Sequence, residues 1–382
     1  MRIVLSGVET NNKGAELMFY AILQEIERSF PEAEVYIPYS KAVGNLCALQ
    51  TSLKLKYTPF SRLPCIGIIG SILRRLHFPS DWVYLIKVIR KANLFLEASG
   101  FAVSDQFNIS DSRVSMWRTI LEYLKKSNCK IVFLPQAFGP CEKENTRLLL
   151  KEISKNASLI MPREEVSFSY LNKSNIVDMK KVRIYPDFTS LVEGVFPLKY
   201  EHLRNGICII PNMRMIDKGH ITIQHYVELL SSIIIKVRKN SMCPIYILNH
   251  EGKDDEKLAL QCRKAVGCSI EVVTGLNALE VKGLIGSSYL TVTSRFHGLA
   301  SALNSGVPCL ATSWSHKYSE LYKDYGVEDG VLNLDDINEA VQTVISYLKP
   351  NNNFAIRQQL EKKRLHIRNT VQDMWRDVWE NV

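Results

Sequence analysis

Short runs of apolar, often β-branched residues recur along the whole chain, and the stretches between them carry apolar residues three and four positions apart. The first of these stretches places Met18, Ala21, Ile22 and Ile26 on one helical face. The apolar runs predict strands over residues 2–6, 34–37, 93–97, 130–134, 158–161, 182–185, 206–210, 244–248, 269–273, 289–293 and 307–311. Near-continuous apolar strands that alternate with helices predict an α/β protein with parallel sheets covered on both faces.

The number of predicted strands favours two sheets, because a single open sheet of that width would be unusual. Residues 191–205 contain no convincing strand and include Gly194 and Pro197, so we expect the domain junction there. One Rossmann-like lobe is expected over residues 1–195 and a second over residues 196–350. Residues 351–382 are expected to form a helix that packs across the lobes. Its predicted buried stripe consists of Leu360, Ile367, Val371, Met374 and Val378.

Charge then narrows the classes of partner. The chain has 382 residues, with 48 Lys and Arg against 39 Asp and Glu, which gives a formal net charge of +9. A basic surface favours an acidic partner: a phosphorylated small molecule, a nucleic acid or an anionic membrane. The basic residues occur as scattered pairs without interleaved aromatics, and no nucleic-acid-binding module is recognisable, so we expect no nucleic-acid partner.

Cysteine usage and hydropathy predict a cytoplasmic protein. The nine cysteines include no Cys-x-x-Cys pair, which favours reduced, mostly buried thiols and no metal site. No apolar stretch reaches the ~18–20 residues that cross a bilayer. The apolar residues 66–73 precede Arg74 and Arg75 and have two interpretations. They form either a packed insertion or a peripheral contact with the inner face of a membrane.

Polar side chains follow most of the predicted strands. In open α/β sheets ligands bind beyond the carboxyl ends of the strands, so residues from both lobes are expected to line a common cleft. The residues in these positions that we select as site candidates are Asn12, Lys13, Asp105, Gln136, Arg163, Asp187, Arg214, Arg295, Phe296, His297 and Lys317.

The segment from Thr293 to Gly298 gives the strongest indication of a binding or catalytic site. A buried strand stops there and a helix begins, so Arg295 and His297 are expected at a helix N-terminus. Free backbone N–H groups and the positive end of the helix dipole favour an anion at this place. The planar fork of Arg295 suits a phosphate or a carboxylate, and His297 can exchange a proton near neutral pH.

Several nucleotide and metal motifs are missing from the sequence. The first strand is not followed by Gly-x-Gly-x-x-Gly, and the chain contains neither a Gly-x-x-x-x-Gly-Lys-Ser/Thr loop nor His-Glu-x-x-His. A Rossmann oxidoreductase and a P-loop nucleotidase are therefore disfavoured.

Six segments taken together resemble the polysaccharide pyruvyl transferase family. They are Asn12-Lys13-Gly14, Ser99-Gly100 with Asp105, Pro135-Gln136 with Gly139-Pro140, Arg163-Glu164 with Ser167, Pro186-Asp187, and Ser294-Arg295-Phe296-His297-Gly298 with Gly306-Val307-Pro308. Their order covers residues 1 to about 325, and the Arg-x-His-Gly signature is the most specific. Gly14-Ala15-Glu16 and Ser99-Gly100-Phe101 depart from the Gly-Asp pair and the glycine triplet of many members.

The resemblance implies a GT-B-like arrangement of two lobes with the site between them. It also implies transfer of pyruvate from phosphoenolpyruvate onto two hydroxyls of a sugar in a cell-surface polysaccharide or its precursor, which can be lipid-linked, without a cofactor. Phosphoenolpyruvate carries a phosphate and a carboxylate, so donor binding is expected at Arg295, Phe296, Arg214 and Lys317. His297 is expected to be the general acid, and Asp105 the carboxylate that stabilises the reacting carbon or takes the hydroxyl proton. Acceptor binding is expected at Asn12, Lys13, Gln136, Arg163 and Asp187.

Two alternatives stay open at this point. The same cleft and charge would serve a GT-B-type glycosyltransferase that uses a nucleotide sugar. The second alternative is a non-catalytic member of the family that binds glycans or partner proteins.

Overall fold

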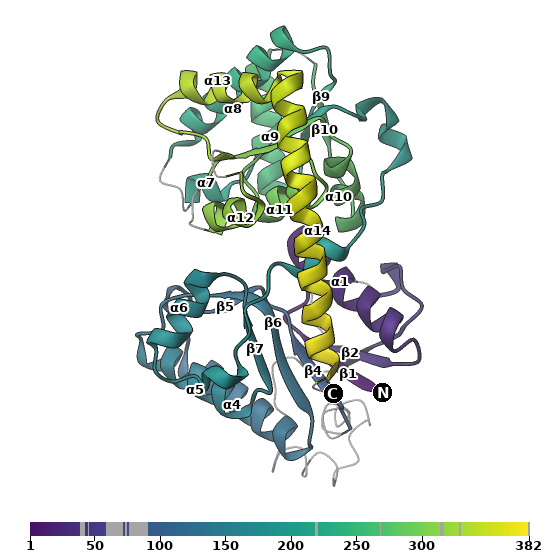
Figure 1. The fold of residues 1–382 in the computed structure, drawn as a ribbon, viewed down its shortest axis with the longest axis vertical. Coiled ribbons are helices and arrows are strands. Elements are labelled where there is room, and N and C mark those ends of the chain that lie inside the picture. The colour runs from purple at the N-terminus through teal and green to yellow at the C-terminus, as the bar shows by residue number, and fades with distance from the viewer. Residues whose placement is uncertain are drawn as a thin grey trace. The chain divides into compact units, whose positions relative to one another are not determined.

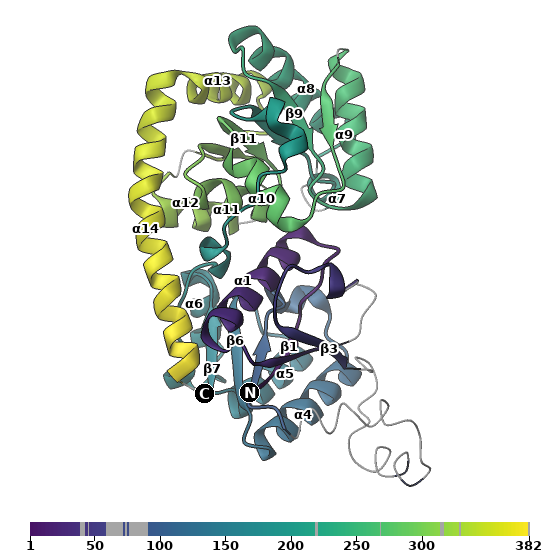
Figure 2. The ribbon, with the colours of Figure 1, turned by 90° about the vertical axis from the view of Figure 1, so that its right-hand side faces the viewer.

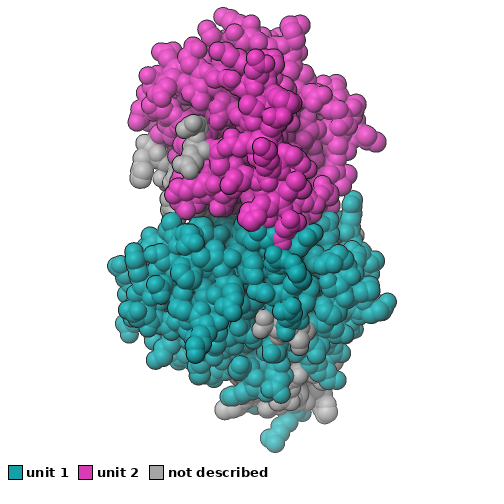
Figure 3. All heavy atoms as spheres, in the orientation of Figure 1, with its two compact units in different colours: residues 1–10, 18–188, 370–382 teal, residues 11–17, 189–369 magenta. Residues whose placement is uncertain are grey.

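The computed structural model describes residues 1–38, 43–44, 46–58, 91–217, 221–267, 269–313, 317–327 and 330–380, together with Ile72 and Arg75. The chain forms two compact units (Figure 3). Unit 1 comprises residues 1–10, 18–188 and 370–382, and unit 2 comprises residues 11–17 and 189–369. The segment 11–17 thus belongs with unit 2, although the strand before it and most of the helix that it opens belong to unit 1.

Unit 1 is built on a parallel sheet of seven strands (Figure 1). Their order is β3-β2-β1-β4-β6-β5, and β7 pairs with β6. The strands are β1 (Arg2–Ser6), β2 (Glu34–Pro38), β3 (Lys54–Thr58), β4 (Leu94–Glu97), β5 (Phe101–Val103), β6 (Lys130–Phe138) and β7 (Leu159–Pro162). The helices are α1 (Lys13–Ser29), α4 (Asp111–Lys126), α5 (Glu144–Asn156) and α6 (Glu165–Lys173).

Unit 2 contains a parallel sheet of five strands in the order β10-β9-β8-β11-β12. The strands are β8 (Ile207–Ile210), β9 (Ile245–Leu248), β10 (Glu271–Val273), β11 (Leu290–Thr293) and β12 (Cys309–Ala311). The helices are α7 (Arg214–Asp217), α8 (Ile223–Asn240), α9 (Gly252–Val266), α10 (Ala278–Gly286), α11 (Phe296–Asn304), α12 (Lys317–Tyr325) and α13 (Ile337–Leu348) (Figure 2).

The sheet of unit 2 separates two hydrophobic cores. Ile207 and Ile209 of β8 pack into one core, and Cys208 and Ile210 pack into the other. Successive side chains of a strand point to opposite faces, so a strand that is buried on both faces needs apolar residues at every position. This requirement is the physical reason why the apolar runs predicted these strands.

The C-terminal helix α14 (Pro350–Glu380) is one continuous helix (Figures 1 and 2). Its residues up to Asn369 belong to unit 2, and those from Thr370 on belong to unit 1. The predicted apolar stripe is confirmed, because its members are buried: Leu360, Ile367, Val371, Met374 and Val378. In unit 1 the helix also buries Trp375, whose ring lies edge-on to Phe188 at 6.0 Å between centroids.

The predicted strand at residues 182–185 is wrong. Only Val182 forms a bridge, to Ile160 of β7, and Arg183 beside it is exposed. The segment lies beside β7, because the N–H groups of Arg183 and Tyr185 donate to the carbonyls of Ile160 at 3.1 Å and Pro162 at 3.2 Å, but its pairing does not extend beyond the single bridge.

Two strands were missed. The edge strand β3 alternates Lys54 and Lys56 with less polar residues, and such charges protect an exposed edge but hide the apolar signal. The other, β5, has three residues and pairs with β6 across a register shift.

No helix in the described part of the chain is both long enough and apolar enough to cross a membrane. The apolar residues 66–73 and the basic residues that follow them, which gave the prediction of a peripheral membrane contact, lie outside the described residues except Ile72, Arg75 and Lys91.

Candidate functional site

The turn between β11 and α11 is held in place by its buried backbone. Ser294 is fully buried, and its backbone N–H donates to the carbonyl of Ile210 at 3.0 Å. The carbonyl of Ser294 accepts from Asn212 Nδ2 at 2.7 Å and from the hydroxyl of Tyr318 at 2.8 Å. These buried hydrogen bonds fix the start of α11, and Arg295 occupies the N-cap position of this helix without a side-chain capping hydrogen bond.

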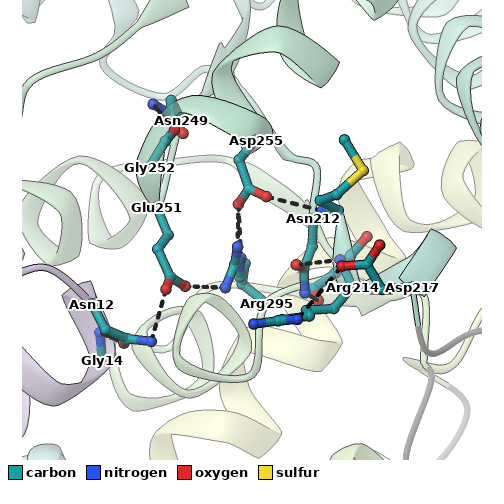
Figure 4. A network of polar contacts seen from close by, with 12 residues as sticks. Asn12, Gly14, Asn212, Arg214, Asp217, Asn249, Glu251, Gly252, Asp255 and Arg295 are labelled. Atoms are coloured by element: carbon teal, nitrogen blue, oxygen red, sulfur yellow. Dashed lines mark hydrogen bonds and ion pairs between the residues drawn. The ribbon is translucent and has the colours of Figure 1, made fainter.

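Arg295 binds two carboxylates of its own unit (Figure 4). Its Nε donates to Oδ2 of Asp255 at 2.9 Å, and a second guanidinium nitrogen contacts the same oxygen. Its Nη1 forms an ion pair with Glu251. The predicted anion-binding fork is thus engaged, in this structure, by anions that the protein itself supplies.

Glu251 connects this pair to the first turn of α1. Its Oε1 accepts a hydrogen bond of 3.1 Å from Asn12 Nδ2. The side-chain oxygen of Asn12 in turn accepts from the backbone N–H groups of Gly14 at 2.9 Å and Ala15 at 3.2 Å, so Asn12 caps α1. The segment 11–17 therefore contributes directly to the site in unit 2 (Figure 4).

His297 lies against the same helical turn. A Cβ built on Gly14 would fall 2.0 Å from Nδ1 of His297, which only a glycine permits. The ring of Phe296 stands edge-on to His297, at 5.3 Å between centroids, and to Tyr318, at 6.1 Å. The predicted residues Asn12, Lys13, Arg295, Phe296 and His297 are thus brought together within one unit.

His250 was not predicted as a site residue. It follows β9, is 4% exposed, and its Nδ1 has no hydrogen-bond partner among the described residues. Burial, together with the charges of Arg295, His297 and Lys13, holds the pKa of His250 well below its usual value of 6.5. The imidazole is therefore neutral at physiological pH.

Arg214 and Lys317 are the two other cationic residues predicted to bind the donor. Arg214 opens the short helix α7, is exposed, and pairs with Asp217 at 3.5 Å; its backbone N–H donates to Asn212 Oδ1 at 2.9 Å. Lys317 is the first residue of α12, and its side chain lies outside the described part of the structure.

The predicted acceptor residues of unit 1 form a buried cluster at the carboxyl ends of β6 and β7. Nη1 of Arg163 lies 3.6 Å from Oδ2 of Asp187, and its Nε lies 3.6 Å from Oε2 of Glu164. All three residues are at least nine-tenths buried. Gln136 is fully buried, and its Nε2 donates to Oε2 of Glu97 at 2.7 Å. Burial raises the pKa of Glu97, although hydrogen bonds from neighbouring groups oppose the change.

Asp105 begins a 3-10 turn in unit 1. Its Oδ2 accepts from the backbone N–H of Glu142 at 2.8 Å, and its Oδ1 accepts from that of Lys143 at 3.1 Å. Partial burial opposes ionisation, but the hydrogen bond from Glu142, the interactions with Thr146 and Lys143 and the charge of Lys143 together lower the pKa of Asp105. The carboxylate therefore anchors the loop that leads into α5.

The described residues contain no group of three or more His, Cys, Asp or Glu arranged to hold a metal ion. Six cysteines are free: Cys243, which is partly buried, and Cys129, Cys141, Cys208, Cys262 and Cys309, which are buried. Burial raises the pKa of Cys129 and of Cys262 to about 12, so neither thiol is ionised at neutral pH.

The sequence model of the family described as "Polysaccharide pyruvyl transferase" matches residues 12–316. The chain belongs to the polysaccharide pyruvyl transferase family, as its motifs predicted.

Solved structures resemble the whole chain at low sequence identity. Anabaena HepE, solved in complex with UDP and glucose, is 11% identical, covers 99% of this chain and 98% of its own, and has a TM-score of 0.63. The UDP-GlcNAc 2-epimerase of Neisseria meningitidis, bound to UDP-GlcNAc, is 10% identical, covers 100% of both chains, and has a TM-score of 0.62. A glycosyltransferase from Rickettsia africae is 10% identical, covers 100% and 99%, and has a TM-score of 0.63. These likenesses confirm the predicted fold class, two Rossmann-like units of the GT-B kind.

Proposed function

We propose that this protein transfers pyruvate from phosphoenolpyruvate to two hydroxyls of a sugar in a polysaccharide or its precursor, forming a cyclic ketal and releasing phosphate. Membership of the family identifies a transferase of polysaccharide modification. The observation that carries the finer proposal is the grouping of Arg295 and His297 with the first turn of α1. It places a strong cation and a proton-exchanging group side by side at a helix N-terminus.

The donor is a small molecule with a phosphate and a carboxylate, so it needs more than one cation. Arg295 is the first candidate, because it sits at the N-terminus of α11. Arg214 is the second, because its guanidinium is exposed and its partner Asp217, at 3.5 Å, is about half exposed as well. Lys317, at the start of α12, is the third. Phe296, packed edge-on to Tyr318, offers an apolar wall.

The reaction needs a proton at the donor's methylene carbon as the neighbouring carbon becomes oxocarbenium-like. We assign this proton to His297. The methylene becomes a methyl group, one sugar hydroxyl adds to the electron-poor carbon, and the bond from that carbon to the phosphate oxygen breaks. The second hydroxyl then completes the ketal, and the two hydroxyl protons are balanced by the new methyl group and the departing phosphate. No redox cofactor or nucleotide enters this scheme.

The acceptor is proposed to be a sugar, free or lipid-linked. Its predicted binding residues are Asn12 and Lys13 in unit 2, and Gln136, Arg163 and Asp187 in unit 1. In unit 1 the ion pairs of Arg163 with Asp187 and Glu164 supply fixed polar groups at the strand ends. Such groups suit the hydroxyls of a sugar.

The test is release of inorganic phosphate from phosphoenolpyruvate across a panel of glycan precursors. His297→Ala is expected to abolish transfer while donor binding stays measurable by calorimetry. His202→Ala is the matched control, because His202 is an exposed histidine of the same unit paired with Glu271. Near-normal turnover of His297→Ala would refute its role as proton donor.

A nucleotide-sugar glycosyltransferase is the second candidate, favoured by the likeness to HepE, which was solved with UDP and glucose. Thermal-shift screening separates the two. Stabilisation by a UDP-sugar and not by phosphoenolpyruvate would replace our proposal with this one, and binding of glycans without turnover of either donor would identify a non-catalytic member.

A further inference from the structure

The two carboxylates that bind Arg295 have different surroundings. Asp255 is 1% exposed at its side chain, and its second oxygen accepts the backbone N–H of Met213 at 2.9 Å. Glu251 is 28% exposed, and its partners are the side chains of Arg295 and Asn12. Removal of the partner of a buried carboxylate leaves an uncompensated charge, whereas a partly exposed carboxylate can turn into water. Of the two carboxylates, only Glu251 can therefore give up its place at Arg295 to the anion of a ligand.

Glu251 does not serve its own helix. It is the N-cap residue of α9, yet its side chain makes no capping hydrogen bond. Its carboxylate turns instead towards Arg295 and Asn12, so that its two oxygens meet a guanidinium N–H and an amide N–H (Figure 4). A carboxylate or phosphate with two free oxygens would find the same two donors.

We propose that Glu251 is an internal competitor for the donor: its carboxylate occupies the outer half of the Arg295 fork and is displaced when the anionic group of the donor binds there. The inference rests on the proposed function, because that function names the donor as an anion. Asp255 keeps the guanidinium oriented during the exchange. The side-chain amide of Asn12, which donates to Glu251 before the exchange, then donates to the donor molecule. Donor binding is thereby linked to the turn of α1 that packs against His297.

The experiment removes, one at a time, the negative charges of the two carboxylates that contact Arg295. Phosphoenolpyruvate and inorganic phosphate are titrated separately, by calorimetry, into the wild-type protein, Glu251→Gln and Asp255→Asn. Glu251→Gln is expected to tighten anion binding about tenfold, the factor that corresponds to ~1.4 kcal/mol. Asp255→Asn is expected to weaken it, because Arg295 loses its buried anchor. The exposed pair of Asp254 with Lys257 supplies the matched control, Asp254→Asn, which is expected to change neither affinity.

The outcomes are distinct. Unchanged or weaker binding of both anions by a folded Glu251→Gln protein overturns the inference, and so does equal tightening in Asp255→Asn, which would reflect only the lost negative charge. A large loss of turnover at unchanged donor affinity also overturns it and makes Glu251 a catalytic carboxylate. Glu251→Gln can also bind phosphate more tightly than wild type while neither of these two proteins binds phosphoenolpyruvate. In that case the competitor role stands and the proposed donor is wrong. Thermal unfolding of each variant verifies that it is folded.

Discussion

Gly14 and His297 are in direct contact, so that any side chain on Gly14 would collide with Nδ1 of the imidazole. Gly14 is the second residue of α1, and His297 is the second residue of α11. The same helical turn carries Asn12, which reaches Glu251 and through it Arg295. The orientation of His297 is thus tied to the first turn of α1.

We expect Gly14→Ala to reduce pyruvate transfer by about 100-fold, because the methyl group pushes His297 from its place, and small displacements of a catalytic group are costly. Donor affinity should change little, since Arg295 is held separately by Asp255. Steady-state kinetics with separate kcat and KM values checks this. Asn11→Ala, an exposed change in the same loop, is the control. A Gly14→Ala protein with wild-type kcat would show that the contact does not position the histidine.

Arg295 is expected to matter for folding as well as for binding. Arg295→Ala leaves Asp255 buried without its cation, which typically costs about 3–5 kcal/mol. Urea unfolding of Arg295→Ala against Arg214→Ala measures the difference, because the partner of Arg214 is half exposed and such pairs contribute about 1 kcal/mol or less. Equal destabilisation of the two variants would contradict the role of Asp255 as the buried anchor. Any loss of donor binding in Arg295→Ala must therefore be measured on folded protein.

The fold was largely predictable because its strands are buried on both faces. Runs such as residues 206–210 have no polar alternation, and only a covered parallel sheet accommodates them. The prediction failed at the edges of the sheet of unit 1. The edge strand β3, which contains Lys54 and Lys56, was missed. Of the strand predicted at residues 182–185, only the bridge of Val182 is present. At an edge, pairing depends on the neighbouring strand more than on the apolar pattern.

The site was predictable only in part. Arg295 and His297 could be found because they follow a buried strand directly. Glu251 and Asp255 could not, because an ion pair across forty or more positions leaves no spacing in the sequence. His250 also follows a strand, but its burial between cationic groups is a property of the folded unit alone.

Asp105→Asn tests the role of the carboxylate that the family resemblance implies to be catalytic. Both oxygens of Asp105 accept backbone N–H groups, so we expect the variant to lose about 1–2 kcal/mol of stability and to retain turnover within a few-fold. Urea unfolding and phosphate release measure the two effects. A loss of turnover of about 100-fold or more at unchanged stability would establish the catalytic role instead.

His250 is expected to make stability depend on pH. Its pKa is held well below 6.5 in the folded protein, first by burial and then by Arg295, His297 and Lys13. Below pH ~6.5 the unfolded chain binds a proton that the folded chain does not, so the contribution is complete above that pH and is lost as the pH falls. The stability difference between pH 7.5 and pH 5.5 should therefore include about 1 kcal/mol from this residue.

Urea unfolding of wild type and His250→Gln at the two pH values isolates this contribution, because most other titrating groups are common to both proteins. The variant keeps a polar side chain but cannot titrate, so its stability should fall less on acidification than that of wild type. Asn11→Ala, an exposed change that removes no titrating group, should follow wild type. If His250→Gln and wild type lose equal stability on acidification, His250 is not held neutral by its cationic neighbours, and the charge balance described for the site is wrong.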